Sequence, residues 1–141
     1  MTAIITIDGK PRGKGRPRFV RATGGTYTDA DTAAYENLVK TLWLTNVGKK
    51  MDGALAVHLD AYYPIPASKP KKTQAAMRED VIRPTTKPDL DNVVKAVLDG
   101  LNGVAFADDS QVVELVSKKW YADKPRVVVC VMPINEPIEG G

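Results

Sequence analysis

A stripe of apolar residues in the C-terminal half of the chain constrains the fold most. Leucine and valine recur there at the three- and four-residue spacing of a helix that buries one face, at Leu90, Val93, Val94, Val97, Leu98 and Leu101. Pro88 prevents this helix from extending backwards, and Asn102-Gly103 supplies a stop signal. The stripe therefore predicts a helix over about residues 89–101 that packs on a core.

The rest of the chain alternates between strand-like and helix-like segments. We expect strands over about 3–8, 54–63, 111–121 and 126–132, a small hairpin over 19–28, and helices over about 29–46 and 71–79. In the helix over 29–46, Ala34, Leu38 and Leu42 are expected to face the core, with Val47 as a further candidate, and Tyr35 and Trp43 are expected to pack inside the protein instead of stacking on bases. The order predicts a single α+β domain over 1–141, with a mixed sheet of about four strands and helices packed on one side.

The net charge of +3 conceals two basic segments. Residues 9–21 hold six lysines and arginines with no acid, and the basic loop over about 64–87 holds six against two acids. Two solvated loops would be the plainer interpretation, but the dense run within 9–21, interleaved with Gly and Pro, favours contact with a polyanion. The predicted DNA-binding residues are Lys14, Arg16, Arg18, Lys71, Lys72 and Lys87. The tail over about 134–141 is acidic and is expected to fray.

Acidic residues gather around the predicted helix. Asp89 occupies the expected N-cap and Asp91 the first turn, so both carboxylates could converge in front of the helix N-terminus. Lys95 lies one turn after Asp91, and Asp108-Asp109 follows in a loop. Each residue also has a structural interpretation: Asp89 as a cap, Asp91 as an i, i+4 partner of Lys95, and Asp108-Asp109 as a turn.

Together, the charges indicate a chemistry. Carboxylates on a phosphate-binding surface repel the substrate unless a divalent cation lies between them, and Asp and phosphate oxygens are the ligands that Mg²⁺ prefers. We therefore predict metal-dependent phosphodiester hydrolysis, with Mg²⁺ held by Asp89, Asp91 and one aspartate of the Asp108-Asp109 pair. Asp108 is the alternative to Asp109, because strand register decides which of the two points at the metal. Lys95 would stabilise developing negative charge or orient the attacking water.

Two motifs resemble the RusA family of Holliday-junction resolvases (crossover junction endodeoxyribonucleases). They are Lys-Pro-Asp-Leu-Asp-Asn-Val-Val-Lys at 87–95 and Phe-Ala-Asp-Asp-Ser-Gln-Val-Val at 106–113. The Gly-Arg-Pro-Arg-Phe stretch and Thr26-Tyr-Thr look like phage and prophage members. The family's metal-binding aspartates match Asp89, Asp91 and Asp109, and its essential lysine matches Lys95. The long segment over 64–87 departs from the shortest members, which reach the first motif through a compact arginine run.

The resemblance implies a homodimer with two Mg²⁺-dependent sites, for which Mn²⁺ is a substitute. Such a dimer nicks symmetric strands across a four-way DNA junction in recombination and repair. A non-catalytic basic DNA-binding protein is the alternative. The Asp-x-Asp motif also occurs in metal-dependent glycosyltransferases, but 141 residues are too few for their nucleotide-binding domain.

The sequence also gives an expectation for location. It shows no secretion-signal pattern, no apolar run long enough to cross a bilayer, and one cysteine. We therefore expect the cytoplasm, that of a bacterial host cell if a phage or prophage encodes the chain.

Overall fold

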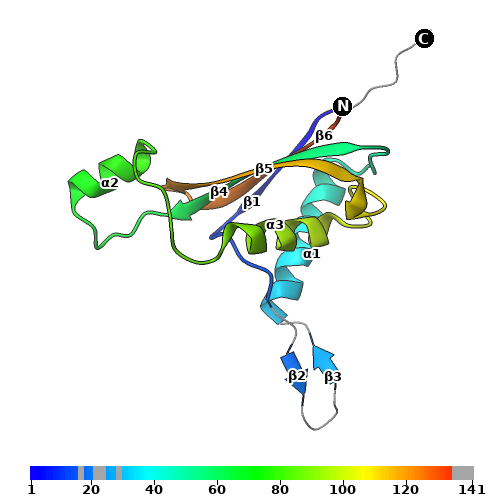
Figure 1. Cartoon of the computed structure of the whole chain (residues 1–141), viewed down its shortest axis with the longest axis horizontal. Helices are drawn as coiled ribbons and strands as arrows, with labels where there is room; N and C mark the ends of the chain where they lie inside the picture. The colour runs from blue at the N-terminus through cyan, green and yellow to red at the C-terminus, as the bar shows by residue number, and fades with distance from the viewer. Residues whose placement is uncertain (16–17, 21–24, 28–29, 135–141) are drawn as a thin grey trace.

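A computed structural model gives the structure of the protein and describes residues 1–15, 18–20, 25–27 and 30–134 (Figure 1). The strands are β1 (Ala3–Asp8), β2 (Arg18–Val20), β3 (Gly25–Tyr27), β4 (Leu55–Pro64), β5 (Val112–Ala122) and β6 (Arg126–Pro133). The helices are α1 (Ala30–Asn46), α2 (Lys71–Arg78) and α3 (Leu90–Leu101), and η1 (Asp109–Gln111) is a 3₁₀ turn. The predicted hairpin is present as β2 and β3, while the predicted frayed tail from residue 135 onward lies outside the described residues.

Four strands form one mixed sheet in the order β1-β6-β4-β5. β6 runs antiparallel to both β1 and β4, whereas β4 and β5 are parallel and are joined through α2 and α3. Figure 1 shows α1 and α3 on the same face of this sheet. The α+β class, the mixed sheet and the one-sided helices are therefore confirmed.

The core lies between the sheet and these two helices. Along β4 and β6, alternate residues such as Val57, Leu59 and Val129 are fully buried, as the pleat of a half-covered sheet requires. From α3, the predicted stripe contributes Val97 and Leu101, which are also fully buried. The stripe that defined the helix in the sequence is thus the face that attaches α3 to the sheet.

The buried face of α1 confirms the prediction for Tyr35, Trp43 and Leu42, which packs against the core, and contradicts it for Ala34 and Leu38. Its buried residues include Tyr35, Val39 and Trp43, whereas Leu38 is 43% exposed and Ala34 is exposed. Two apolar stripes, one residue apart, were available on this helix. The observed one places Val39 against Gly100 of α3, where a Cβ atom would come within 2.8 Å of Val39 Cβ, so only a glycine allows the helices to approach this closely.

The connection between the parallel strands β4 and β5 determines which end of the sheet each end of α3 lies near. The start of α3 lies near the end of β4, because the Tyr63 hydroxyl donates a hydrogen bond to the carbonyl oxygen of Pro88. The other end of α3 leads toward the start of β4, where Gln111 Nε2 donates to the carbonyl oxygens of Met51 and Gly53 at 3.1 Å. Among the described residues, no helix is long and apolar enough to cross a membrane.

Candidate active site

A groove of about 900 Å³ lies at the N-terminal end of α3. Three stretches of chain line it: the segment 10–15, the start of α1 at Asp31 and Thr32, and residues 87–89 together with Asn92. Four of the lining side chains are cationic and two are acidic. The groove therefore combines a positive surface with carboxylates at a helix N-terminus, a region whose backbone dipole favours anions.

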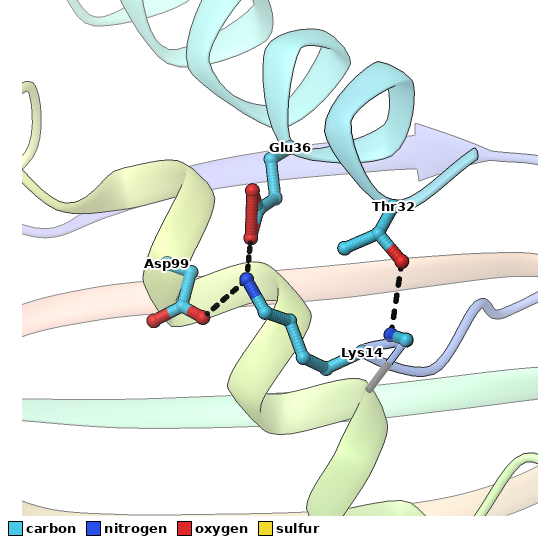
Figure 2. A network of polar contacts seen from close by, with 5 residues as sticks. Lys14, Thr32, Glu36 and Asp99 are labelled. Atoms are coloured by element: carbon cyan, nitrogen blue, oxygen red, sulfur yellow. Dashed lines mark hydrogen bonds and ion pairs between the residues drawn. The ribbon is translucent and has the colours of Figure 1, made fainter. Parts of the chain in front are cut away.

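The segment 10–15 is attached to both helices (Figure 2). The backbone N–H of Lys14 donates to the carbonyl oxygen of Asn92 at 3.0 Å, and the N–H of Gly15 donates to Thr32 Oγ1 at 2.9 Å. Gly13 approaches α3 so closely that a Cβ atom there would lie 3.0 Å from Pro88 Cβ. This wall of the groove is therefore held in one place, although its Gly- and Pro-rich sequence forms no regular structure.

Lys14, predicted to bind DNA, has two carboxylate partners inside the protein. Its ammonium group pairs with Glu36 of α1 and, at 3.0 Å, with Asp99 of α3, and its side chain is only 20% exposed. Burial alone would lower the pKa of Lys14, but its hydrogen bonds to Glu36 and Asp99 outweigh burial and raise it. Because two acids already balance this charge, the structure makes Lys14 a link between the basic segment and both helices.

Asp89 lies at the N-terminus of α3 and lines the groove. It occupies the N-cap position with extended backbone angles, but its side chain makes no capping hydrogen bond. The carboxylate is close to the phenol of Tyr63: burial and then the charge of Asp89 raise the pKa of Tyr63 to about 12. The capping interpretation therefore does not account for Asp89, whose carboxylate remains available to the groove.

Asp91 and Lys95 lie on exposed positions of the first two turns of α3. Within the described ranges no ion pair joins them, so the proposed i, i+4 pair is absent. Neither residue lines the groove. Asp91 nevertheless lies next to the groove, because Asn92, its neighbour in the sequence, and Asp89 line that groove.

Asp108 and Asp109 follow the opposite, C-terminal end of α3, at the start of η1. The helix has 12 residues, which makes it about 18 Å long, so Asp109 and Asp89 of one chain are far apart. The hydroxyl of Ser110 donates to Asp108 Oδ2 at 2.6 Å, and this bond is the main cause of the lowered pKa of Asp108. Asp108 therefore belongs to a local turn.

A single chain does not bring the three predicted metal ligands together. In the described part of the chain, no group of three or more His, Cys, Asp or Glu side chains is placed to hold a metal ion. The acidic residues instead form two separate sets, Asp89 with Asp91 at the start of α3 and Asp108 with Asp109 after its end. A magnesium site remains a prediction.

The family can now be assigned. The sequence profile described as "Endodeoxyribonuclease RusA" matches residues 8–132. The chain belongs to the RusA family. It is also 34% identical over 136 residues to "Uncharacterized protein YqaN" of Bacillus subtilis (strain 168), an alignment that covers 93% of this chain and 96% of that protein.

The predicted cations of this RusA-family chain lie in three places. Lys87 lines the groove, whereas Lys71 and Lys72 are exposed in the first turn of α2, which projects beyond the end of the sheet in Figure 1. Arg16 lies outside the described residues, and Arg18 is described only as the first residue of β2.

Sequence reasoning missed two groove cations. Lys10 and Arg12 line the groove and are exposed, but they were counted only within the charge of the basic segment. The signal that could have selected them is the two-residue spacing of the cations in this run, Lys10, Arg12 and Lys14. That spacing does not show how Lys14 differs from Lys10 and Arg12: of the three, Lys14 is the one that pairs with acids of α1 and α3.

Proposed function

We propose that this RusA-family protein is a Mg²⁺-dependent endodeoxyribonuclease that resolves four-way DNA junctions by paired, symmetric nicks in recombination and repair. The observation that carries the proposal is the uncapped carboxylate of Asp89, which lies in a groove lined by Lys10, Arg12 and Lys87. The cations suit a DNA backbone, and the carboxylate suits a metal ion between itself and a phosphate.

The acidic residues at the start of α3 fit magnesium. Mg²⁺ is usually held by one or two protein carboxylates, and water and substrate phosphate complete its shell. Asp89 and Asp91 would hold the ion on this basis, and Mn²⁺ would substitute for it. When bound, such an ion polarises a phosphoryl oxygen and makes a water molecule a stronger nucleophile.

The remaining residues bind and orient the DNA. Lys10, Arg12 and Lys87 would contact successive backbone phosphates along the groove. Lys95 is exposed one turn after Asp91, where its ammonium group would stabilise negative charge that develops on the phosphate. Lys14 holds the groove wall in place through Glu36 and Asp99.

The proposal includes a homodimer. One chain carries one groove with Asp89, and a four-way junction requires two cuts on opposing strands. Asp109 is too far from Asp89 to share an ion within one chain, since about 18 Å of helix separates them. If Asp109 is a ligand, it therefore acts in the groove of the second chain.

Cleavage of an end-labelled synthetic four-way junction tests this proposal. With Mg²⁺ we expect paired nicks on the junction, none on linear duplex of the same sequence, and none with EDTA. Asp89→Asn and Asp91→Asn should each reduce nicking by at least about a hundredfold and leave junction binding intact. The matched control is Asp52→Asn, which removes an exposed carboxylate outside the groove.

Two results would contradict the proposal in different ways. Tight, salt-dependent junction binding without nicks in Mg²⁺ or Mn²⁺ would identify a DNA-binding protein instead of an enzyme. Equal cutting of junction and duplex would keep the metal-dependent nuclease but remove its selectivity for junctions.

A further inference from the structure

A second cavity, of about 310 Å³, opens beside the groove. The two share Lys10, Pro11, Lys87 and Pro88 as lining residues, so both spaces border these residues. None of the acidic residues assigned to metal binding lines the second cavity. A DNA strand whose phosphates lie in the groove would therefore have its attached bases within reach of this space.

The walls of the second cavity are aromatic rings and prolines. Tyr63 and Tyr121 come from the adjacent parallel strands β4 and β5, on which they are paired in register, and Pro66 and Pro88 complete the walls. Flat apolar rings of this kind stack on nucleobases of any sequence, because every base has a π-face. The volume lies near the lower limit of small-molecule sites, which suits one base better than a larger ligand.

Contacts within the chain tie the walls of the cavity together. Tyr63 is only 3% exposed, and its hydroxyl is bonded to the Pro88 carbonyl oxygen. The ammonium group of Lys119 lies 4.7 Å from the centre of the Tyr63 ring and donates to the carbonyl oxygen of Thr86 at 2.7 Å. These contacts fix the walls, so a base that enters would lose little energy to rearrangement of the protein.

We propose that the cavity walled by Tyr63, Tyr121 and Pro66 takes one unpaired nucleobase of the strand whose phosphates occupy the groove. Lys10 and Lys87, which border both spaces, would hold the phosphates on either side of that base. The proposal rests on the DNA substrate proposed above and deepens it. Capture of a base requires that the base leave its stack, which costs least where pairing is interrupted, as at the crossover of a junction. The cavity would thus contribute to both structure selectivity and sequence preference at the cut.

An abasic scan tests the proposal directly. Junctions in which single nucleotides around the crossover lack their base are titrated with Asp91→Asn protein, so that binding is measured without cutting. At one position on each bound strand, loss of the base should weaken binding about tenfold, the effect of losing one base–aromatic stack. Tyr121→Leu should weaken binding of the intact junction by a similar factor. Combining the variant with that abasic junction should cause no further loss, because both changes remove the same contact.

Two further variants test whether a loss of binding in Tyr121→Leu comes from the cavity and not from misfolding or from loss of a tyrosine elsewhere on the sheet. Thr86→Trp, at an exposed position on the rim, should fill the cavity and reproduce the abasic effect without altering the core. Tyr62→Leu is the matched control: Tyr62 precedes Tyr63 on β4, points to the opposite face of the sheet, and stacks with Arg126 at 4.0 Å. It should show no coupling to any abasic position.

The outcomes separate the cavity from the proposed nuclease activity. If no abasic position is coupled to Tyr121→Leu or Thr86→Trp while the wild-type protein nicks junctions, the base-binding proposal fails and the enzyme remains. If coupling is found but the wild-type protein never nicks DNA with Mg²⁺ or Mn²⁺, the cavity is supported and the enzymatic proposal fails. Equal coupling of Tyr62→Leu would also overturn the base-binding proposal.

Discussion

The two ends of α3 carry the acidic residues, and they are built differently. At the N-terminal end, Asp89 makes no capping bond and faces a groove with Lys10, Arg12 and Lys87. At the C-terminal end, Asp108 is bonded to Ser110, and η1 leads directly into β5. Acids only 20 positions apart in sequence, Asp89 and Asp109, therefore lie in different surroundings. The comparison indicates that the N-terminal end is where a phosphate and a metal would meet.

For Asp109 to bind the proposed metal ion, it would have to reach the other end of α3. The 12 residues of α3, about 18 Å of helix, lie between Asp89 and the loop that leads to Asp109, so Asp109 cannot join Asp89 and Asp91 through a small side-chain movement. Either a second chain supplies Asp109, or the two ends of α3 come closer in the working enzyme, or Asp109 does not bind the proposed metal ion. Mixing experiments distinguish these cases.

The largest effect is expected from mixing two inactive variants. Asp89→Asn and Asp109→Asn chains should each fail to nick junctions alone. In a mixed dimer, one site would combine the intact Asp89 of one chain with the intact Asp109 of the other. The mixture should therefore regain nicking, on a single strand of each junction, as measured by denaturing electrophoresis of end-labelled DNA.

A second mixture controls for this result. Asp89→Asn with Asp91→Asn chains should remain inactive, because both residues belong to the same end of α3 and every mixed site lacks one of them. If the Asp89→Asn and Asp109→Asn mixture also remained inactive, while Asp109→Asn alone was inactive, Asp109 would act in its own chain. That outcome would require the two ends of α3 to be closer in the working enzyme than the structure shows.

A smaller effect separates Lys14 from Lys10, two cations of the same segment. Lys14→Met leaves Glu36 and Asp99 without a counter-ion and should lower the free energy of unfolding by about 2 kcal/mol. The salt dependence of junction binding should not change, because the ammonium group of Lys14 is already paired with Glu36 and Asp99. Lys10→Met should do the opposite: stability remains, and the slope of log affinity against log salt falls by about one unit. Urea unfolding and binding titrations measure both. A reduced salt slope for Lys14→Met would restore the original prediction that this residue binds DNA.

The fold was more predictable than the site, for physical reasons. Strand alternation and the α3 stripe are local signals, so elements such as Leu55–Pro64 and Val112–Ala122 were predicted to within one residue. The strand order β1-β6-β4-β5 depends on pairing between distant segments, which periodicity does not encode. On α1, the sequence did not select between two stripes one residue apart, and the burial of Val39 depends on its close contact with Gly100 of α3.

The site was predicted in part. The positions of Asp89 at the N-cap and of Asp91 and Lys95 in the first turns of α3 were predicted, because the stripe fixes where that helix starts, while their roles stay predictions. The length of α3 could have been calculated from the sequence, but the position of Asp109 also depends on the path of residues 102–108, which lead to η1 and β5 in the structure. The partners of Lys14 could not be predicted, since Glu36 and Asp99 come from helices whose contact is known only from the structure. The second cavity also depends on β4 and β5 being neighbours.

The smallest effect is expected from a substitution in the groove wall at the N-terminal end of α3. In Gly13→Ala, the new Cβ would lie 3.0 Å from Pro88 Cβ and 3.2 Å from Asn92 Cβ, so the segment must shift away by a few tenths of an ångström. The shift should move Lys10 and Arg12 relative to Asp89 and reduce nicking about threefold, with stability almost unchanged.

Gly48→Ala is the control: Gly48 follows α1 with φ +73°, so alanine there should cost about 1 kcal/mol of stability and leave nicking normal. Nicking rates on the labelled junction and urea unfolding would be compared for both variants. If Gly48→Ala slowed nicking more than Gly13→Ala, overall stability, and not the placement of the segment 10–15, would control the activity of the groove.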